Sequence, residues 1–115
     1  MNKTILIVDD SYSIRESIGF FLSESGFEII KASDGKDALS VLDGRKIDLI
    51  LTDLHMPIMN GIELISNVRK TENYKRIPIL LLTTETLKAK KLEAKKAGAT
   101  GWLNKPFEKH IDFSP

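Results

Sequence analysis

The sequence predicts an α/β fold in which helices cover both faces of a parallel β-sheet. Three runs, at 5–8, 47–51 and 77–82, are almost continuously apolar and rich in β-branched residues. Runs without polar alternation are typical of strands that are buried on both faces of a parallel sheet. Longer amphipathic segments separate these runs, and this alternation is typical of strand–helix–strand units with right-handed crossovers.

Two further segments are expected to form the edge strands. Residues 28–32 mix polar and apolar side chains, and residues 101–104 form a very short run. Edge strands are commonly short or partly polar because they have a neighbour on one side only. With three apolar strands inside and these two at the edges, the sequence predicts a doubly wound, five-stranded sheet in the flavodoxin-like order 2-1-3-4-5.

The first helix is predicted directly after the first strand. Ser13 and Glu16 have the spacing of a capping box, and Gly26 is expected to end the helix. Apolar residues then recur at the spacing of one helix face. This face consists of Ile14, Ile18, Phe21 and Leu22.

Three more helices complete the pattern. A short helix is expected over 36–42, and a lysine-rich one over 87–97, where Gly98 follows as a stop. Between them, Asn60 with Glu63 has the spacing of a capping box at the start of a helix.

The composition is that of one ordinary globular domain. The chain has 115 residues, of which 42% are hydrophobic and 29% charged, so residues 1–115 are interpreted as a single domain. The net charge of +1 gives no reason to expect a nucleic-acid partner. No apolar stretch is long enough to cross a bilayer, and there is no cysteine. These features predict a cytoplasmic protein that is not attached to a membrane.

Polar side chains follow four of the five predicted strands. Asp9 and Asp10 follow the first, Asp53 the third, Thr83 the fourth and Lys105 the fifth. Ligands of open α/β sheets bind beyond these strand ends, and the first and third strands are predicted neighbours. Three carboxylates that converge repel one another, and a hard cation such as Mg²⁺ relieves the repulsion. A lysine at the same edge adds positive charge.

Each of these residues also has an ordinary structural explanation. An aspartate after a strand is commonly a turn former or a helix cap. A single threonine is commonly a hydrogen-bonded hydroxyl, and a single lysine a surface side chain. The predicted site therefore depends on the combination of complementary groups at four strand ends.

Several motifs together resemble the receiver domain of two-component response regulators, the CheY-like family. They are ILIVDD at 5–10, TDLHMPIMNG at 52–61, LLTT at 81–84, AGA at 97–99 and KPF at 105–107. Their order and spacing are those of the family. The likeness covers about residues 3–107, and residues 108–115 form an atypical tail.

The resemblance implies a role for each acidic position. Asp53 resembles the phosphoacceptor of the family. Asp9 and Asp10 resemble the acidic pair that holds Mg²⁺, or Mn²⁺ in its place, together with Asp53 and the backbone carbonyl of His55. The implied donor is a sensor histidine kinase or a phosphotransfer protein, and the implied recipient of the signal is a downstream protein target. Self-phosphorylation and autodephosphorylation are the only implied reactions, so no other enzyme activity is expected.

Other positions match residues that respond to the phosphoryl group. Thr83 and Lys105 resemble the hydroxyl and the ammonium that bind its oxygens. Trp102 stands where the family has a tyrosine or phenylalanine that changes rotamer, so Thr83 and Trp102 are the implied switch. His55 and Glu85 occupy two variable positions that tune phosphate lifetime.

The end of the chain departs from the family pattern. The family has a fifth helix after KPF, and residues 108–115 are too short to form it. We expect either self-association, in which Ile111 and Phe113 insert into a second copy, or a chain that is a piece of a longer regulator. A stand-alone regulator of the chemotaxis type is also compatible with the sequence. The resemblance also implies a cis peptide bond between Lys105 and Pro106.

Three other functions fit the sequence less well. A haloacid-dehalogenase-type phosphatase needs a second aspartate two residues after its nucleophile, where this chain has His55. A flavodoxin-like FMN carrier needs a phosphate-binding loop after the first strand, where this chain has two aspartates. A receiver that binds partners without being phosphorylated is the third alternative, which the intact acidic residues and Lys105 disfavour.

Overall fold

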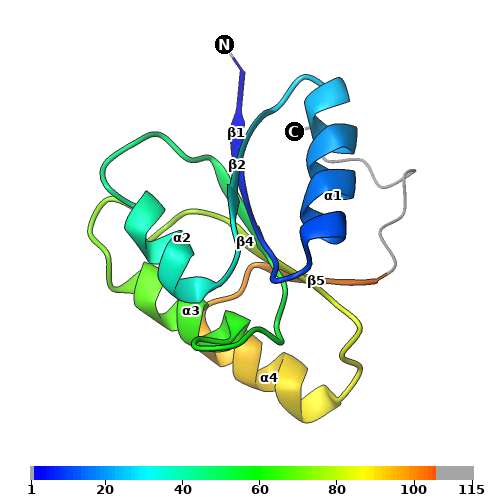
Figure 1. Ribbon diagram of the computed structural model, residues 1–115. Coiled ribbons are helices and arrows are strands. Elements are labelled where there is room, and N and C mark those ends of the chain that lie inside the picture. Colours follow the sequence, from blue (N-terminus) through cyan, green and yellow to red (C-terminus); the bar gives the residue numbers. More distant parts are fainter. Residues whose placement is uncertain (1, 106–115) are drawn as a thin grey trace.

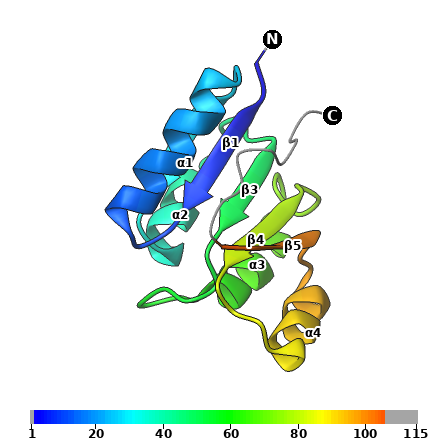
Figure 2. The ribbon, with the colours of Figure 1, turned by 90° about the vertical axis from the view of Figure 1, so that its right-hand side faces the viewer.

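The computed structural model describes residues 2–105 (Figure 1) and contains one parallel sheet in the order β2-β1-β3-β4-β5. Figure 2 shows β1, β3 and β4 side by side. The strands are β1 (Thr4–Val8), β2 (Glu28–Ala32), β3 (Leu49–Thr52), β4 (Ile79–Thr83) and β5 (Gly101–Asn104). The helices are α1 (Tyr12–Glu24), α2 (Gly35–Val41), α3 (Gly61–Arg69) and α4 (Lys88–Ala97). The predicted α/β class and strand order are confirmed, with β2 and β5 at the edges.

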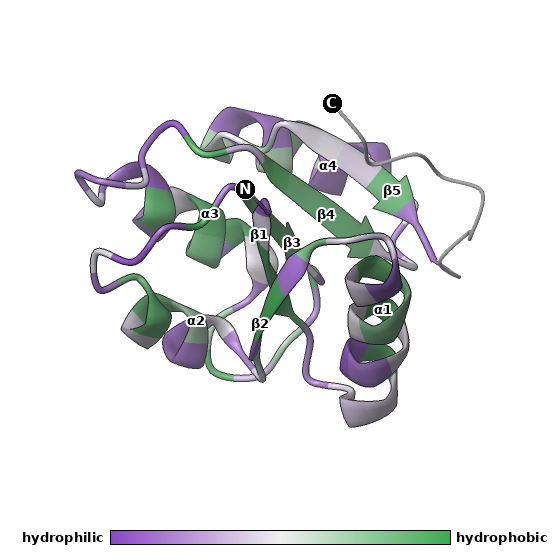
Figure 3. Cartoon of the chain, turned by 90° about the horizontal axis from the view of Figure 1, so that it is seen from above, coloured by the Kyte–Doolittle hydropathy of each residue, from purple (hydrophilic) through white to green (hydrophobic). Residues whose placement is uncertain are grey.

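The sheet separates two apolar cores. Successive residues of a strand point to opposite faces, so Leu6 and Val8 of β1 join one core and Ile5 and Ile7 the other. The first core lies under α2, α3 and α4, and the second lies under α1 (Figure 3). Both helical layers are therefore present, as expected from strands that are apolar on both faces.

The core under α1 is the smaller of the two. Among residues 2–105, it holds six buried apolar residues, against sixteen on the other face. Its buried members are Ile5, Ile7, Ile18, Leu22, Leu51 and Leu82. The predicted missing helix, the cis bond to Pro106 and the insertion of Ile111 and Phe113 all concern residues 106–115, which lie outside the described residues.

The start of α1 differs from the prediction. Ser11, not Ser13, is the N-cap, and its hydroxyl accepts a hydrogen bond from a backbone N–H of the first turn. Asp9 accepts the backbone N–H of Ser11 at 2.9 Å, which turns the chain into the helix two residues early. Glu16 therefore lies inside the helix, where it pairs with Lys31 of β2 at 2.8 Å. The predicted capping box of Ser13 and Glu16 was wrong, because the tight turn at the end of β1 makes Ser11 the N-cap.

The start of α3 agrees with the prediction. The Asn60 side chain accepts the backbone N–H of Glu63 at 2.8 Å, and Glu63 accepts that of Asn60 at 2.9 Å. Gly61 then begins the helix, and a Cβ there would collide with the backbone carbonyl oxygen of Asp53. This close approach fixes the loop between β3 and α3 against the end of β3.

No helix among residues 2–105 is long and apolar enough to cross a membrane.

Arg69, the last residue of α3, ties three segments together. Its guanidinium donates to the carbonyl oxygen of Gly98 at 3.0 and 2.7 Å and to that of Ile77 at 2.6 Å. Gly98 is the C-cap of α4, so the positive charge lies at the negative end of that helix. Burial lowers the pKa of Arg69 from its ordinary value. The guanidinium nevertheless stays charged, because an arginine does not lose its proton in proteins.

We expect Arg69→Met to lower the free energy of unfolding by about 2–3 kcal/mol, because hydrogen bonds from a charged donor are lost and the carbonyl groups stay partly buried. Urea denaturation followed by circular dichroism measures the change. Arg76→Met, in the exposed turn before β4, is the matched control and should change stability little. Equal losses in the two variants would show that Arg69 is not a structural tie.

Candidate functional site

The three predicted carboxylates converge at the carboxyl end of the sheet. Asp9 and Asp10 follow β1, Asp53 follows β3, and these neighbouring strands pair in parallel with Val8 opposite Thr52. One ligand oxygen from each carboxylate lies within 4.8 Å of the others. Asp9 and Asp53 are buried and Asp10 is exposed, so the cluster opens to solvent on one side.

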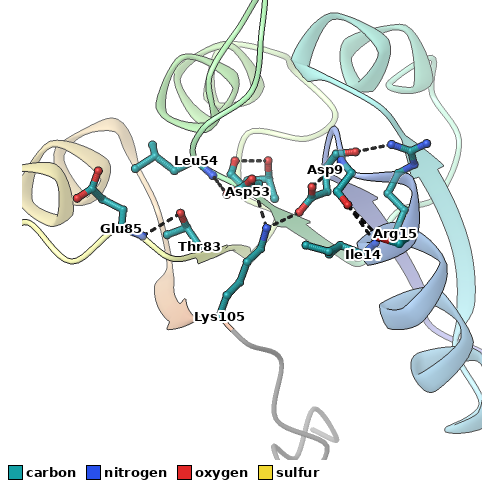
Figure 4. A network of polar contacts seen from close by, with 11 residues as sticks. Asp9, Ile14, Arg15, Asp53, Leu54, Thr83, Glu85 and Lys105 are labelled. Atoms are coloured by element: carbon teal, nitrogen blue, oxygen red, sulfur yellow. Dashed lines mark hydrogen bonds and ion pairs between the residues drawn. The ribbon is translucent and has the colours of Figure 1, made fainter.

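Backbone groups orient the two buried carboxylates. Asp53 Oδ1 accepts the backbone N–H of Leu54 at 2.7 Å, and Asp9 Oδ1 accepts that of Ser11 at 2.9 Å (Figure 4). The second oxygen of each side chain remains for other partners. The two side chains are therefore held in defined positions before any ligand binds.

Lys105 supplies the positive charge of the site. Its Nζ lies 2.8 Å from Asp9 Oδ2 and 3.3 Å from Asp53 Oδ2 (Figure 4). Its backbone N–H donates to the Thr83 carbonyl oxygen at 2.9 Å, which holds the end of β5 beside β4. Burial lowers the pKa of Lys105, but the hydrogen bond to Asp9 and the charges of Asp53 and Asp9 outweigh burial and raise it. Lys105 is therefore protonated at neutral pH.

Thr83 lies at the end of β4, fully buried beside β3. Its hydroxyl accepts the backbone N–H of Glu85 at 3.2 Å, so this side chain contacts the loop that leads into α4. Figure 4 shows Thr83 beside Asp53 and Lys105. The structure thus brings all five predicted strand-end residues to one edge of the sheet.

A pair of side chains connects the loops after β3 and β4. His55 Nε2 lies 2.8 Å from Glu85 Oε1, although the residues are thirty positions apart. The backbone N–H of Leu87 lowers the pKa of Glu85, and the hydrogen bond with His55 adds to this. Glu85 is therefore ionised at neutral pH. The part assigned to the His55 backbone carbonyl, as a metal ligand, stays a prediction.

Trp102 lies in the middle of β5, half-buried against the core under α4. Its Nε1–H donates to Asn104 Oδ1 at 3.2 Å, and Lys91 Nζ lies 5.5 Å from the ring centre. These contacts place the ring next to α4. Its predicted rotamer change stays a prediction.

Arg15 is a residue of the site that sequence reasoning missed. Its guanidinium donates to the backbone carbonyl oxygen of Asp9 at 2.6 Å and lies 5.8 Å from the ring centre of Tyr12. It thereby ties the loop after β1 to the first turn of α1. No motif marks this position, because an arginine on a helix surface is common and its partner is a main-chain group.

The donor set fits a small divalent cation. Carboxylate oxygens are the ligands that Mg²⁺ prefers, and the exposed side of the cluster leaves room for the waters that it keeps. Within residues 2–105, no cysteine or histidine side chain joins this cluster, so softer metals are less well matched.

Comparisons with known proteins agree with this geometry. The family model of the response regulator receiver domain matches residues 5–111. The chemotaxis protein CheY-3 of Vibrio cholerae is 39% identical over 107 residues, which cover 92% of this chain and 82% of that protein.

Two solved structures are also similar. Chemotaxis protein CheY4 of Vibrio cholerae has a TM-score of 0.91 at 45% identity, covering 95% of this chain and 91% of that one. The second structure is the receiver domain of a Pseudomonas aeruginosa sensor histidine kinase, with magnesium coordinated in its active-site cleft. It has a TM-score of 0.86 at 28% identity, covering 95% of this chain and 89% of that one. The chain therefore belongs to the response regulator receiver domain family of two-component signalling systems.

Proposed function

We propose that this receiver domain accepts a phosphoryl group on Asp53, in a reaction that needs Mg²⁺ or Mn²⁺, from a sensor histidine kinase or a phosphotransfer protein. It then signals to a downstream protein target. The observation that carries the proposal is the recessed Asp53, which faces two other carboxylates within 4.8 Å and Lys105 at 3.3 Å. A carboxylate is a weak nucleophile. Such a site orients the carboxylate and offsets the negative charge of the incoming phosphoryl group.

The proposed reaction is a phosphoryl transfer. A carboxylate oxygen of Asp53 forms a bond to phosphorus, and the bond between phosphorus and the donor's histidine nitrogen breaks. The nitrogen keeps the electron pair of that bond, and the donor's imidazole leaves as a neutral ring because its other nitrogen carries a proton. A cation held by Asp9, Asp10, Asp53 and the His55 carbonyl would supply positive charge at the transferred oxygens.

Lys105 and Thr83 would carry the signal away from the new phosphoryl group. The aspartyl phosphate has about two negative charges, and Lys105 already lies beside Asp53 to bind its oxygens. If the Thr83 hydroxyl turns to the phosphoryl group, it gives up the Glu85 N–H that it now accepts. The loop before α4 would then move, and Trp102 beside α4 would change its rotamer.

The test is incubation with acetyl phosphate and MgCl₂, read by intact-protein mass spectrometry. We expect one added phosphoryl group per chain, and none when EDTA is present. Absence of labelling under both conditions would contradict the proposal and favour a receiver that only binds partners.

The side chains of His55 and Glu85 are expected to set the lifetime of the phosphorylated state. Because His55 lies two residues after Asp53 and the backbone N–H of Glu85 donates to the Thr83 hydroxyl, we expect His55→Ala and Glu85→Ala each to change the dephosphorylation rate severalfold without preventing phosphorylation. The side chains are hydrogen-bonded at 2.8 Å, so the double variant should resemble the single ones rather than multiply their effects. Decay of the phosphorylated chain, followed by mass spectrometry, measures this.

Glu72→Ala is the control for that series, since Glu72 lies in the turn before β4, at the opposite end of the sheet. Its decay rate should equal that of the wild type. Unchanged decay in both His55 and Glu85 variants would remove these side chains from the mechanism.

Further parts of the function belong to the same proposal. We infer a cytoplasmic location, because the donors of such relays act there. We also propose self-association through the face of the sheet that carries α1, where the core is small. Light scattering over a concentration series tests this, and a monomer at every concentration would contradict it.

A further inference from the structure

Asp10 is the one carboxylate of the acidic cluster that no contact within residues 2–105 holds in place. Its side chain is exposed and makes neither a hydrogen bond nor an ion pair with the described residues. Asp9 and Asp53, in contrast, each accept a backbone N–H and lie beside Lys105. The position of the Asp10 carboxylate therefore depends on the main chain that carries it.

Three hydrogen bonds form a closed ring around Asp10. The Asp9 carboxylate accepts the backbone N–H of Ser11 at 2.9 Å, and the Ser11 carbonyl oxygen accepts the backbone N–H of Arg15 at 3.0 Å. The Arg15 guanidinium closes the ring, because it donates to the Asp9 carbonyl oxygen at 2.6 Å (Figure 4). Both peptide groups that flank Asp10 are thereby held, although its side chain makes none of these bonds.

The Arg15 guanidinium is the part of the ring that local structure does not require. The other two bonds are a turn closed by an aspartate and the first bond of α1, and both are ordinary at the start of a helix. The guanidinium makes no ion pair with the described residues, so its partner at the site is the main chain. Tyr12, whose ring centre lies 5.8 Å away, limits the directions in which this planar group can donate.

A cation in this place has two conceivable effects on a metal ion, and they have opposite signs. As a positive charge next to the acidic cluster, Arg15 would repel Mg²⁺ and weaken its binding. As a donor to the Asp9 carbonyl, it would hold the peptide between Asp9 and Asp10 and so strengthen binding. Carboxylates whose oxygens lie within 4.8 Å repel one another, so a restraint on the main chain between two of them keeps them together.

We propose that Arg15 is a positioning residue for the divalent cation. By holding the peptide between Asp9 and Asp10, it directs the Asp10 carboxylate toward the other two and thereby strengthens Mg²⁺ binding. The proposal rests on the proposed function, because it concerns the same metal site. Loss of a group that orients a metal ligand commonly lowers metal affinity by about 10–100-fold.

The test is a titration with MgCl₂, followed by heteronuclear NMR of the backbone amides, which also reports whether each variant is folded. We expect Arg15→Met to weaken Mg²⁺ binding by about tenfold. When Asp10→Ala is already present, Arg15→Met should have little further effect, because the side chain that Arg15 positions is gone. A general loss of stability would act in both backgrounds, so this double-mutant cycle separates the two explanations.

Two further variants serve as controls. Arg76→Met removes the same charge from the exposed turn before β4 and should bind Mg²⁺ as the wild type does. Arg15→Lys keeps the charge but loses the planar fork, so its affinity should also fall, and it decides the question if Arg15→Met does not fold. With acetyl phosphate, both Arg15 variants should need more MgCl₂ for half-maximal labelling, while the rate at saturating MgCl₂ falls by less.

Several outcomes would overturn the proposal. Equal or tighter Mg²⁺ binding by the Arg15 variants would leave Arg15 no positioning role. A further loss of about tenfold when Arg15→Met is added to Asp10→Ala would show that its effect does not pass through Asp10. In both cases the wild type still binds Mg²⁺, so the proposed function stands. If the wild type does not bind Mg²⁺, the metal site of the proposed function fails first.

Discussion

Asp53→Asn is expected to reduce phosphorylation by acetyl phosphate to the background level. An amide has the shape of the carboxylate but is not a nucleophile under these conditions, and it removes the negative charge that pairs with Lys105 at 3.3 Å. Asp9 remains available to Lys105 at 2.8 Å, so the ammonium keeps a partner and the fold should persist. Intact mass spectrometry, with circular dichroism as a check of folding, measures both effects.

The control for this variant is Asp43→Asn, which alters an exposed carboxylate that pairs with Arg45 in a loop distant from the site. Its labelling should equal that of the wild type. If Asp53→Asn is labelled as fast as the wild type, another residue is the acceptor and the proposed mechanism is wrong. Peptide mapping of the labelled chain would then locate the true site.

Asp10→Ala is expected to weaken Mg²⁺ binding by about tenfold or more. Within residues 2–105 the Asp10 carboxylate has no hydrogen-bond or ion-pair partner, whereas Asp9 and Asp53 share Lys105. Asp10 therefore contributes negative charge that nothing in the described fold neutralises. A bound cation is attracted by this charge, and removal of the side chain takes that attraction away.

The same variant should change thermal stability in two ways. Without metal, Asp10→Ala should melt at a higher temperature than the wild type, because repulsion within the acidic cluster falls. With Mg²⁺, the wild type should be stabilised by ligand binding and the variant much less. Titration calorimetry and thermal unfolding measure these effects, again with the Asp43 variant as control. Equal Mg²⁺ affinity in wild type and Asp10→Ala would place the metal elsewhere.

The sequence alone was sufficient for the fold class and for the convergence of three carboxylates at one edge of the sheet. Continuous apolar strands require cover on both faces, and mixed or short strands belong at the edges of a sheet. These two rules predicted the strand order 2-1-3-4-5, which the structure confirms. The capping box of Asn60 and Glu63 could also be predicted from the sequence, because its two hydrogen bonds join residues three positions apart. Asp9, Asp10 and Asp53 could be brought together because topology alone places the ends of neighbouring strands side by side.

Other features depended on geometry that no local pattern encodes. Ser11 rather than Ser13 caps α1, because the Asp9 carboxylate closes a turn at the end of β1. The pairing of His55 with Glu85 joins two loops whose separation depends on how β3 and β4 are packed and where each chain turns.

What the sequence by itself determined was the periodicity of each element and the residue type at each strand end, since these follow from neighbours a few positions away. Only the tertiary structure decided where each side chain points. The bond of Lys105 to Asp9, ninety-six positions away, and the positive φ of Ile58 are examples. Both arise because packing fixes loops in positions that their own residues would not select, and packing depends on contacts between distant parts of the chain.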